Sequence, residues 1–305
     1  MAIVIYAVYD DTTPDATLTL SVDDSTVQPG DTVSVSANVN PTDYIASAVV
    51  LDRSGSTTTL VSASTTLYDG IVTDLSGTRP DGTVIGSDIL LGDILDVSSR
   101  TGTWGLSYSS EGTKSVTVEA RSDNMVDKTA TINVIVDGTE PGAVKGLTSS
   151  SHTAGVWSNN PNITWTWNAA TDALSGLQGY GIYETTSCSI PDTILDIGAV
   201  TTHTGGPYSS SLSGRAFNIR SVDNSDNWDA DYVCDSNYLI DVDDPTAPTF
   251  NSSSHTIGGK SCNTTITVNW NAGTDGHSGV EGYGIVWSST PTGCRANILD
   301  TTGTS

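Results

Sequence analysis

Residues 163–169 read Ile-Thr-Trp-Thr-Trp-Asn-Ala, and residues 266–272 read Ile-Thr-Val-Asn-Trp-Asn-Ala. Apolar side chains alternate with short polar ones in both stretches, which is the period of a strand with one buried face. The likeness extends over Ser149–Ile182 and Ser252–Ile285, where 21 of 34 positions are identical at a constant offset of 103 residues. The sequence therefore predicts two copies of one β-rich unit, the second without the counterpart of Arg215–Val242.

A second pattern, Asp-x-Thr-x-Pro, separates the units. It occurs at residues 10–14, 137–141 and 244–248, each time after an apolar run. Because proline cannot donate a hydrogen bond to a sheet, each copy predicts a last strand followed by a linker. The expected organisation is a piece of a longer tandem array: residues 1–14 as the last strand of a preceding module plus its linker, 15–141 as module one, 142–248 as module two, and 249–305 as the first half of module three.

The fold class predicted is all-β, with tandem antiparallel β-sandwiches arranged as an extended rod. Alternating runs predict strands at Leu18–Val22, Thr32–Val39, Ser47–Leu51, Thr57–Ser62, Lys114–Ala120, Ala130–Val136, Ile163–Trp167, Gly179–Tyr183, Ala216–Val222 and Tyr238–Val242. A helical period occurs only at Ile89–Leu95, and the stretch Thr65–Asp96 is expected to be an inserted loop or an extra hairpin.

The charge balance argues against two classes of partner. The chain has 35 acidic and 11 basic residues and a net charge of −24. Binding to nucleic acid phosphates or to an anionic membrane surface requires Lys and Arg, so neither partner is expected. No apolar run reaches the length of a membrane span, and no membrane insertion is expected in this segment. The surplus of carboxylates favours solubility and cation binding.

The four cysteines predict disulfides rather than a metal site. None forms a Cys-x-x-Cys pair, and no histidine lies near enough in sequence to complete a zinc cluster. Disulfides place the chain in an oxidising, extracellular compartment. Four cysteines allow three pairings, and we expect Cys188–Cys234 because both belong to module two, which leaves Cys262–Cys294.

Module two resembles the fibronectin type III-like domains of microbial surface proteins. The residues that carry the resemblance are Ile163–Trp167, the Tyr-bearing strand Gly179–Tyr183, and the late strand Ala216–Val222 followed by Asp223–Trp228. Module one is similar to bacterial or archaeal Ig-like repeats, through Val27–Asp31 and through Val116–Ala120 leading to Asp123-Asn124. The resemblance implies a row of β-sandwiches on a cell surface or in an extracellular appendage, where such modules serve spacing, adhesion and assembly.

Carboxylates gather at the module boundaries, and oxygen ligands of this kind suit Ca²⁺. The candidate ligands are Asp10, Asp11, Asp137, Glu140, Asp223, Asp226, Asp243 and Asp244, together with Asp172 and Asp275 of an Asp-x-x-Ser-Gly loop that recurs at 172–176 and 275–279. Two other interpretations stay open. The carboxylates can form a solvated acidic surface, and Asp172 and Asp275 can accept backbone hydrogen bonds that fix a turn.

Aromatic and histidine residues have structural interpretations. Trp167 recurs as Trp270 and is predicted to lie in the core, whereas a sugar-stacking platform is the alternative. Trp157 and Trp287 are predicted to be exposed contact residues. His152 recurs as His255, and we expect a hydrogen-bonding role near the first strand.

The expected function is structural and adhesive: a stalk of a surface protein or a subunit of an extracellular filament. No His-Glu-x-x-His or Gly-x-Ser-x-Gly pattern is present, and no catalytic activity is expected. The alternatives are accessory carbohydrate-binding modules of a secreted enzyme and a virion decoration module. Expected partners are a glycan or cell-surface ligand, or a second copy that receives the strand Ile3–Tyr9 by β-strand addition.

Overall fold

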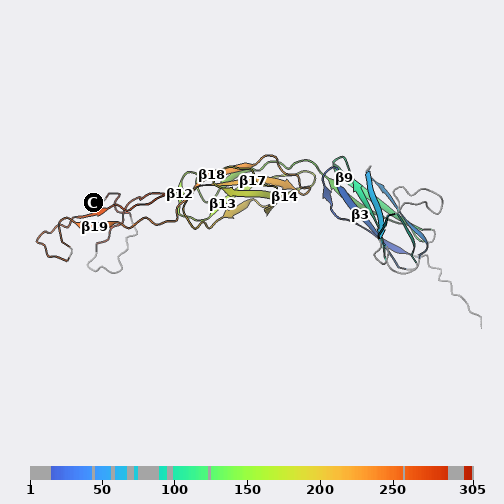
Figure 1. Ribbon diagram of the computed structural model, residues 1–305, viewed down its shortest axis with the longest axis horizontal. Helices are drawn as coiled ribbons and strands as arrows, with labels where there is room; N and C mark the ends of the chain where they lie inside the picture. The colour runs from blue at the N-terminus through green and yellow to red at the C-terminus, as the bar shows by residue number, and fades with distance from the viewer. Residues whose placement is uncertain are drawn as a thin grey trace, which may run out of the picture.

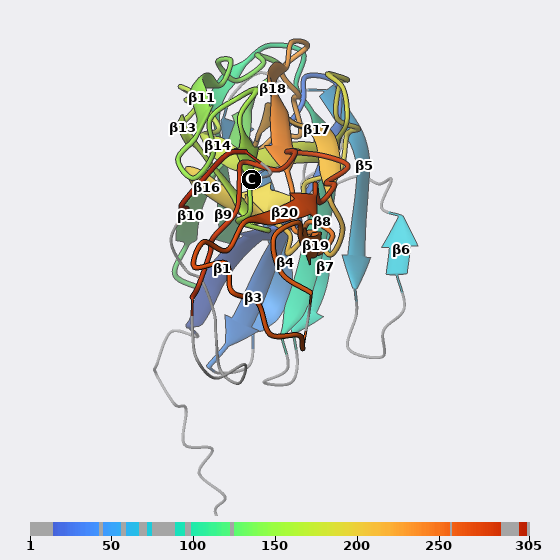
Figure 2. The same ribbon diagram turned by 90° about the vertical axis from the view of Figure 1, so that its left-hand side faces the viewer.

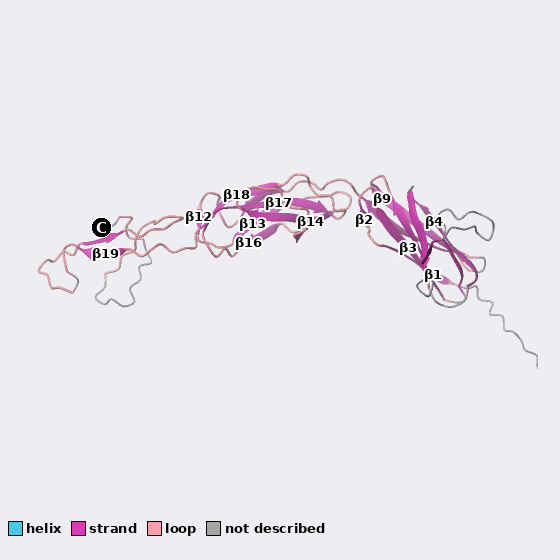
Figure 3. Cartoon of the chain, viewed as in Figure 1, coloured by secondary structure: helices cyan, strands magenta, loops and turns pink. Residues whose placement is uncertain are grey.

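The computed structural model describes residues 15–42, 45–55, 59–66, 72–74, 89–94, 99–122, 125–256, 258–287 and 299–303. Strands joined by turns and loops make up all of these residues, without a helix (Figure 3), which confirms the all-β prediction. No helix in the described part of the chain therefore has the length and apolar character needed to cross a bilayer. The sheets of the three modules follow one another along the long axis of the molecule (Figure 1), and the view turned by 90° places module three in front of the others (Figure 2).

Module one contains two five-stranded sheets. The first has the order β1 (Ala16–Val22), β3 (Thr32–Pro41), β8 (Arg100–Ser107), β5 (Thr59–Thr66) and β6 (Val72–Asp74). The second has the order β2 (Thr26–Val27), β10 (Lys128–Val136), β9 (Gly112–Arg121), β4 (Ile45–Gly55) and β7 (Ile89–Ile94). All neighbours are antiparallel except β2 and β10, which run parallel.

The two sheets of module one share one core because their strands alternate as the sequence predicts. In β3 every second residue from Val33 to Val39 is buried, and in β9 Val116 and Val118 are buried. The largest side chain in this core is that of Trp104, from β8. All of these residues belong to one hydrophobic cluster, to which both sheets contribute.

The stretch Thr65–Asp96, expected to be an inserted loop or an extra hairpin, contains strands where the structure describes it. Residues Ile89–Ile94 form the strand β7, which pairs with β4 through Leu51 and Ile89. Ile89 and Leu91 are both buried, so the two-residue period of a strand is the one that the core uses. The pairing with β4 outweighs a local pattern that is too short to specify a helix.

Module two has a three-stranded and a five-stranded sheet. The smaller has the order β11 (Lys145–Ser149), β13 (Ile163–Asn168) and β16 (Thr202–Gly205). The larger has the order β12 (Trp157–Ser158), β18 (Val233–Ile240), β17 (Leu212–Asp223), β14 (Leu177–Thr185) and β15 (Ile197–Gly198). The last predicted strand is displaced, because β18 ends at Ile240 rather than at Val242.

Aromatic rings fill the core between these two sheets. Trp165 and Trp167 of β13 are both buried, which confirms the core role predicted for Trp167. Phe217 of β17 stacks on both indoles, at centroid distances of 4.8 Å from Trp165 and 5.8 Å from Trp167. Tyr238 of β18 meets Trp165 edge to face at 6.1 Å. The core thus combines side chains from the first and the second half of the module.

Module three repeats the first half of module two in its contacts as well as its sequence. Its strands β19 (Thr249–Ser252) and β20 (Val268–Asn271) pair antiparallel. Trp270 meets Tyr283 at 5.4 Å, as Trp167 meets Tyr180 at 5.5 Å. His255 and His152 likewise make the same three contacts: to the preceding serine, to a serine hydroxyl three residues earlier and to a carbonyl oxygen eight residues later. The structural role predicted for these histidines is confirmed.

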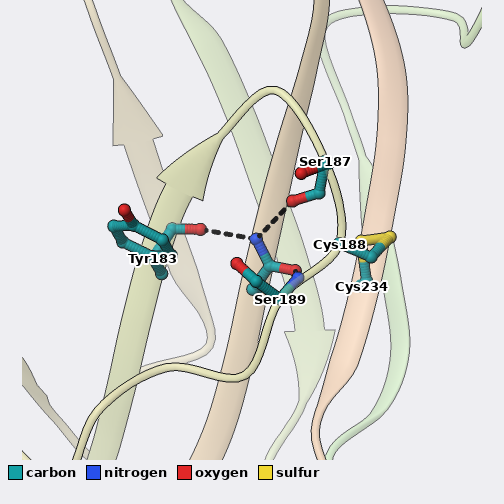
Figure 4. Close-up of a disulfide and its surroundings, with 6 residues drawn as sticks. Tyr183, Ser187, Cys188, Ser189 and Cys234 are labelled. Carbon is teal, nitrogen blue, oxygen red and sulfur yellow. Dashed lines mark hydrogen bonds between the residues drawn. A yellow bond between two sulfur atoms is a disulfide. The ribbon is translucent and has the colours of Figure 1, made fainter.

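The disulfide predicted in module two is present (Figure 4). Cys188 and Cys234 are joined by a bond of 2.05 Å, which ties the loop after β14 to the strand β18. Beside it, Asn218 of β17 accepts a hydrogen bond from the backbone of Ser189 at 2.9 Å. Cys262 is exposed and its thiol is free, and Cys294 lies outside the described residues. The predicted pairing of Cys262 with Cys294 is therefore not formed in this structure.

Candidate functional site at the module boundaries

Asp137 connects the end of module one to module two. It directly follows β10 and is fully buried. Its backbone N–H donates to the carbonyl oxygen of Val27 at 2.8 Å, and its Oδ1 accepts from the backbone of Thr139 at 3.0 Å. Its Oδ2 accepts a hydrogen bond from the backbone N–H of Ser175, in module two, at 3.0 Å. One buried carboxylate thus accepts hydrogen bonds from backbone N–H groups on both sides of the boundary.

Ser175 belongs to the Asp-x-x-Ser-Gly loop, which Asp172 holds in shape. Oδ1 of Asp172 accepts from the backbone N–H groups of Leu174 at 3.0 Å and Gly176 at 2.8 Å. Burial opposes ionisation of Asp172, but the hydrogen bonds from Gly176, Leu174 and Ser175 outweigh it and hold the pKa of this carboxyl below its usual value. The turn-fixing interpretation is therefore confirmed for this loop.

Asp223, at the end of β17, is the third acidic residue of the first boundary. It is fully buried, and its Oδ1 accepts from the backbone N–H groups of Ser225 and Asn227, both at 2.8 Å. The amide of Asn227 donates to Oδ2 of Asp223 at 2.8 Å and to the carbonyl oxygen of Asp137 at 2.9 Å. Asn227 therefore bridges the two buried acids across the boundary.

These contacts bring three carboxylates together. Asp137, Asp172 and Asp223 each offer an oxygen, and the three oxygens lie within 4.8 Å of one another. Like charges so close repel, and backbone N–H groups donate to each of the three carboxylates. Carboxylate oxygens with free lone pairs can hold a metal ion, and an all-oxygen set is the one that hard cations prefer. The cluster therefore could bind a metal ion.

The second boundary repeats the first through Asp241. This residue directly follows β18, and its backbone N–H donates to Ser158 at the end of β12 at 2.9 Å, as Asp137 donates to the last residue of β2. Its Oδ1 accepts from the backbone of Asp243 at 3.1 Å. Its Oδ2 accepts from the backbone N–H of Ser278 in module three at 3.0 Å. Hydrogen bonds from Ser278 lower the pKa of Asp241 well below its usual range.

The structural counterpart of Asp137 is therefore Asp241, not Asp244 as the Asp-x-Thr-x-Pro pattern indicated. The linker contacts agree with this register: Gly142 donates to Thr171 at 2.9 Å, and Thr246 donates to Thr274 at 2.8 Å. Sequence reasoning missed Asp241 because it followed the threonine and proline of the pattern. The signal that identifies it is its place directly after the last apolar residue of a strand.

The second boundary also gathers ligands, but of a different kind. Atoms of Asp241, Asp243 and His277 lie within 4.8 Å of one another, and Oδ2 of Asp243 is 3.8 Å from Nδ1 of His277. An imidazole nitrogen favours transition metals over Ca²⁺. The two boundaries therefore share their hydrogen bonds but differ in the cations that they suit.

The other predicted ligands lie apart from these clusters. Glu140 is exposed and accepts a hydrogen bond from the backbone of Ala230 at 3.0 Å, and Asp226 is exposed with a φ of 60°. Asp275 holds its loop as Asp172 does, with Gly279 donating at 3.0 Å. Asp244 is exposed. Asp10 and Asp11 lie outside the described residues.

No family model matches this chain, and neither does any curated protein. Solved structures show weak similarity. BslA, a bacterial hydrophobin, is 13% identical over 41% of this chain and 97% of its own, with a TM-score of 0.30. The adhesin InvE from Yersinia pseudotuberculosis is 14% identical over 71% of this chain and 58% of its own, with a TM-score of 0.22. The sporulation control protein Spo0M from Bacillus subtilis is 8% identical over 73% of this chain and 90% of its own, with a TM-score of 0.24.

TM-scores of this size carry no argument about fold or function. The repeated boundary contacts are the features of the chain from which its function can be argued. They require a tandem arrangement, because each joins the end of one module to a loop of the next.

Proposed function

We propose that this chain is a structural and adhesive segment of an extracellular surface protein, a stalk or filament subunit. In this proposal its Ig-like and fibronectin III-like sandwiches form an extended rod. The observation that carries the proposal is the repeated contact between a strand-terminal aspartate and the loop of the following module, Asp137 to Ser175 and Asp241 to Ser278.

A repeated contact of this kind supports a spacing role. A flexible linker would leave neighbouring modules free to rotate. At both boundaries a nearly buried carboxylate instead accepts a backbone hydrogen bond from the next module. Leaving the fully buried carboxylate of Asp137 without its donor costs about 1–3 kcal/mol, so bending at the first boundary is opposed. Because both boundaries use the same contact, the same kind of restraint on bending acts at each of them.

The chemistry of the chain supports an extracellular location. The disulfide Cys188–Cys234 is of a kind that persists in oxidising compartments. The net charge of −24 opposes aggregation of neighbouring molecules. Both properties suit a surface protein.

Small-angle scattering of the full chain tests the spacing role. The double variant Asp137→Ala/Asp241→Ala removes the two carboxylates that accept from Ser175 and Ser278, and we expect a broader distance distribution with a smaller maximum dimension. Asp244→Ala is the matched control, since Asp244 is exposed at the same linker but makes no cross-boundary contact. A double variant that scatters like the native chain would contradict the proposal.

The proposal includes Ca²⁺ at the first boundary. Asp137, Asp172 and Asp223 supply three carboxylates, and Ca²⁺ takes six to eight oxygens, so carbonyl groups and water would complete its shell. A bound cation would also relieve the repulsion among the three acids and stiffen the boundary.

Isothermal titration of the full chain with Ca²⁺ tests this site. We expect binding that Asp172→Asn weakens and that Asp275→Asn, at the corresponding position of the second loop, leaves unchanged. Mg²⁺ serves as the competing ion. Titration without heat, together with a melting temperature that a chelator does not change, would exclude the cation while leaving the spacing role to the scattering test.

A further inference from the structure

Module three carries an open apolar groove of about 760 Å³. Its lining includes Phe250, Ile266, Val268, Trp270, Tyr283 and Trp287. Large apolar side chains are exposed there: 67% of Phe250, 51% of Ile266 and 67% of Trp287. A contiguous exposed apolar surface of this kind marks a place where another group packs.

The same face is closed in module two. In the repeat, Ile266 corresponds to Ile163, which is fully buried, and Trp270 corresponds to Trp167, which is 4% exposed. The ring contact of Trp270 with Tyr283 matches that of Trp167 with Tyr180. The groove is therefore the core face of a sandwich in its native local arrangement.

Two strands close this face in module two. β17 pairs with β14 and places Phe217 on Trp165 and Trp167, and β18 pairs with β17 and adds Tyr238. Within the described residues of module three, no strand corresponds to β17 or β18. The cover that module two has over this face thus consists of two adjacent antiparallel strands with aromatic and branched side chains on one face.

We infer that the groove is the acceptor of one antiparallel β-hairpin of the β17–β18 type. The first strand of the hairpin pairs with the segment Val280–Val286, as β17 pairs with β14. Its inward face carries an aromatic residue at the position of Phe217 and aliphatic or aromatic residues at those of Ile219, Tyr238 and Ile240. Its outward face is polar.

The lining also indicates which hairpin fits best. Val268 stands where module two has Trp165. A valine side chain is smaller than an indole, so the groove has extra space at this position. Close packing requires the occupant to fill that space. The preferred hairpin therefore carries a side chain larger than phenylalanine at the position of Phe217.

Hydrogen exchange of an extended full chain tests the acceptor. Residues 212–242 are appended after Ser305 through a flexible linker, with Cys234→Ser in the appended copy so that no new disulfide forms. Exchange at residues 268–271 and 280–286 is expected to slow about ten-fold or more, independently of protein concentration. The same extension with Phe217→Trp is expected to slow it further.

The matched control is the same extension with Phe217→Asp and Ile219→Asp in the appended copy, which keeps the length and backbone but not the apolar face. Equal protection by both extensions, or protection by neither, would overturn the proposal. So would protection of the unextended chain that increases with concentration and disappears on deletion of residues 1–14. That result would make the occupant the strand Ile3–Tyr9 of a second copy.

Discussion

Modules two and three have the same first half but differ in what packs over their core face. The Trp–Tyr contact, the histidine contacts and the Asp-x-x-Ser-Gly loop are the same in both. Burial is not: Ile163 is fully buried, whereas its counterpart Ile266 is 51% exposed. The comparison teaches that the repeated sequence specifies local contacts, whereas the core requires strands from elsewhere.

The contacts at the two boundaries also divide into those that use the first half of the next module and those that use its second half. Asp137 and Asp241 reach the first-half loop of the next module in the same way. Among the described residues, the first boundary adds contacts with residues 223–230 of the second half: Asn227 donates to Asp137, Ala230 donates to Glu140, and Thr26 donates to the carbonyl oxygen of Asn224. The basic boundary contact therefore depends on the first half alone, and the second half reinforces it.

The largest effect is expected from a substitution that removes the side chain covering the core of module two, so that this core resembles the exposed core face of module three. Phe217→Ala removes the ring that stacks on Trp165 and Trp167 and leaves a cavity, which destabilises the module by about 3–5 kcal/mol. Hydrogen exchange at the amides of β13 and β14 measures this loss separately from the other modules.

Tyr183→Ala is the control for this variant. The side chain of Tyr183 is 52% exposed, so its loss is expected to change stability by no more than about 0.5 kcal/mol. If Phe217→Ala changed the exchange no more than the control does, the cover would contribute little to closing the core.

A smaller effect is expected from the disulfide that joins the two halves of module two. Cys188 lies after β14 and Cys234 in β18, 46 residues apart. Closing a loop of this length stabilises the folded state by about 2–4 kcal/mol. In Cys188→Ser/Cys234→Ser, exchange at β17 and β18 should therefore accelerate. Cys262→Ser is the control, because its thiol is exposed and free. Unchanged exchange in the double variant would mean that the hydrogen bonds of Asn218 hold the loop without the bond.

The sequence predicted most of the strands because their apolar residues alternate. It also predicted Cys188–Cys234, from the membership of both cysteines in one module, and the buried Trp167, from its recurrence. The apolar run Ile89–Ile94 shows a helical spacing but forms a strand. A short apolar run takes its conformation from its neighbours, and here β4 makes it a strand.

The boundary clusters were predictable only in part. Asp137, Asp172 and Asp223 were expected as ligands, but nothing in their spacing indicated that these three meet while Asp226 stays apart. Their meeting depends on how modules one and two dock, through Ser175 and Asn227. Docking between modules is a long-range property that local sequence patterns do not encode.

The smallest expected effect concerns the loop that both modules share. Folding lowers the pKa of Asp172 from its ordinary value of 3.8, so its ionised form stabilises the loop. That contribution is fully present above about pH 4 and is lost as the pH falls through the lowered pKa. NMR titration of the Leu174 and Gly176 amides should follow this loss.

Asp172→Asn keeps an acceptor oxygen but cannot ionise, and it should remove the acid dependence at a cost of about 1 kcal/mol or less. Asp226→Asn, exposed nearby, should titrate as the native chain does. An acid transition that persists unchanged in Asp172→Asn would contradict this prediction, because the loop would then not depend on the charge of its own aspartate.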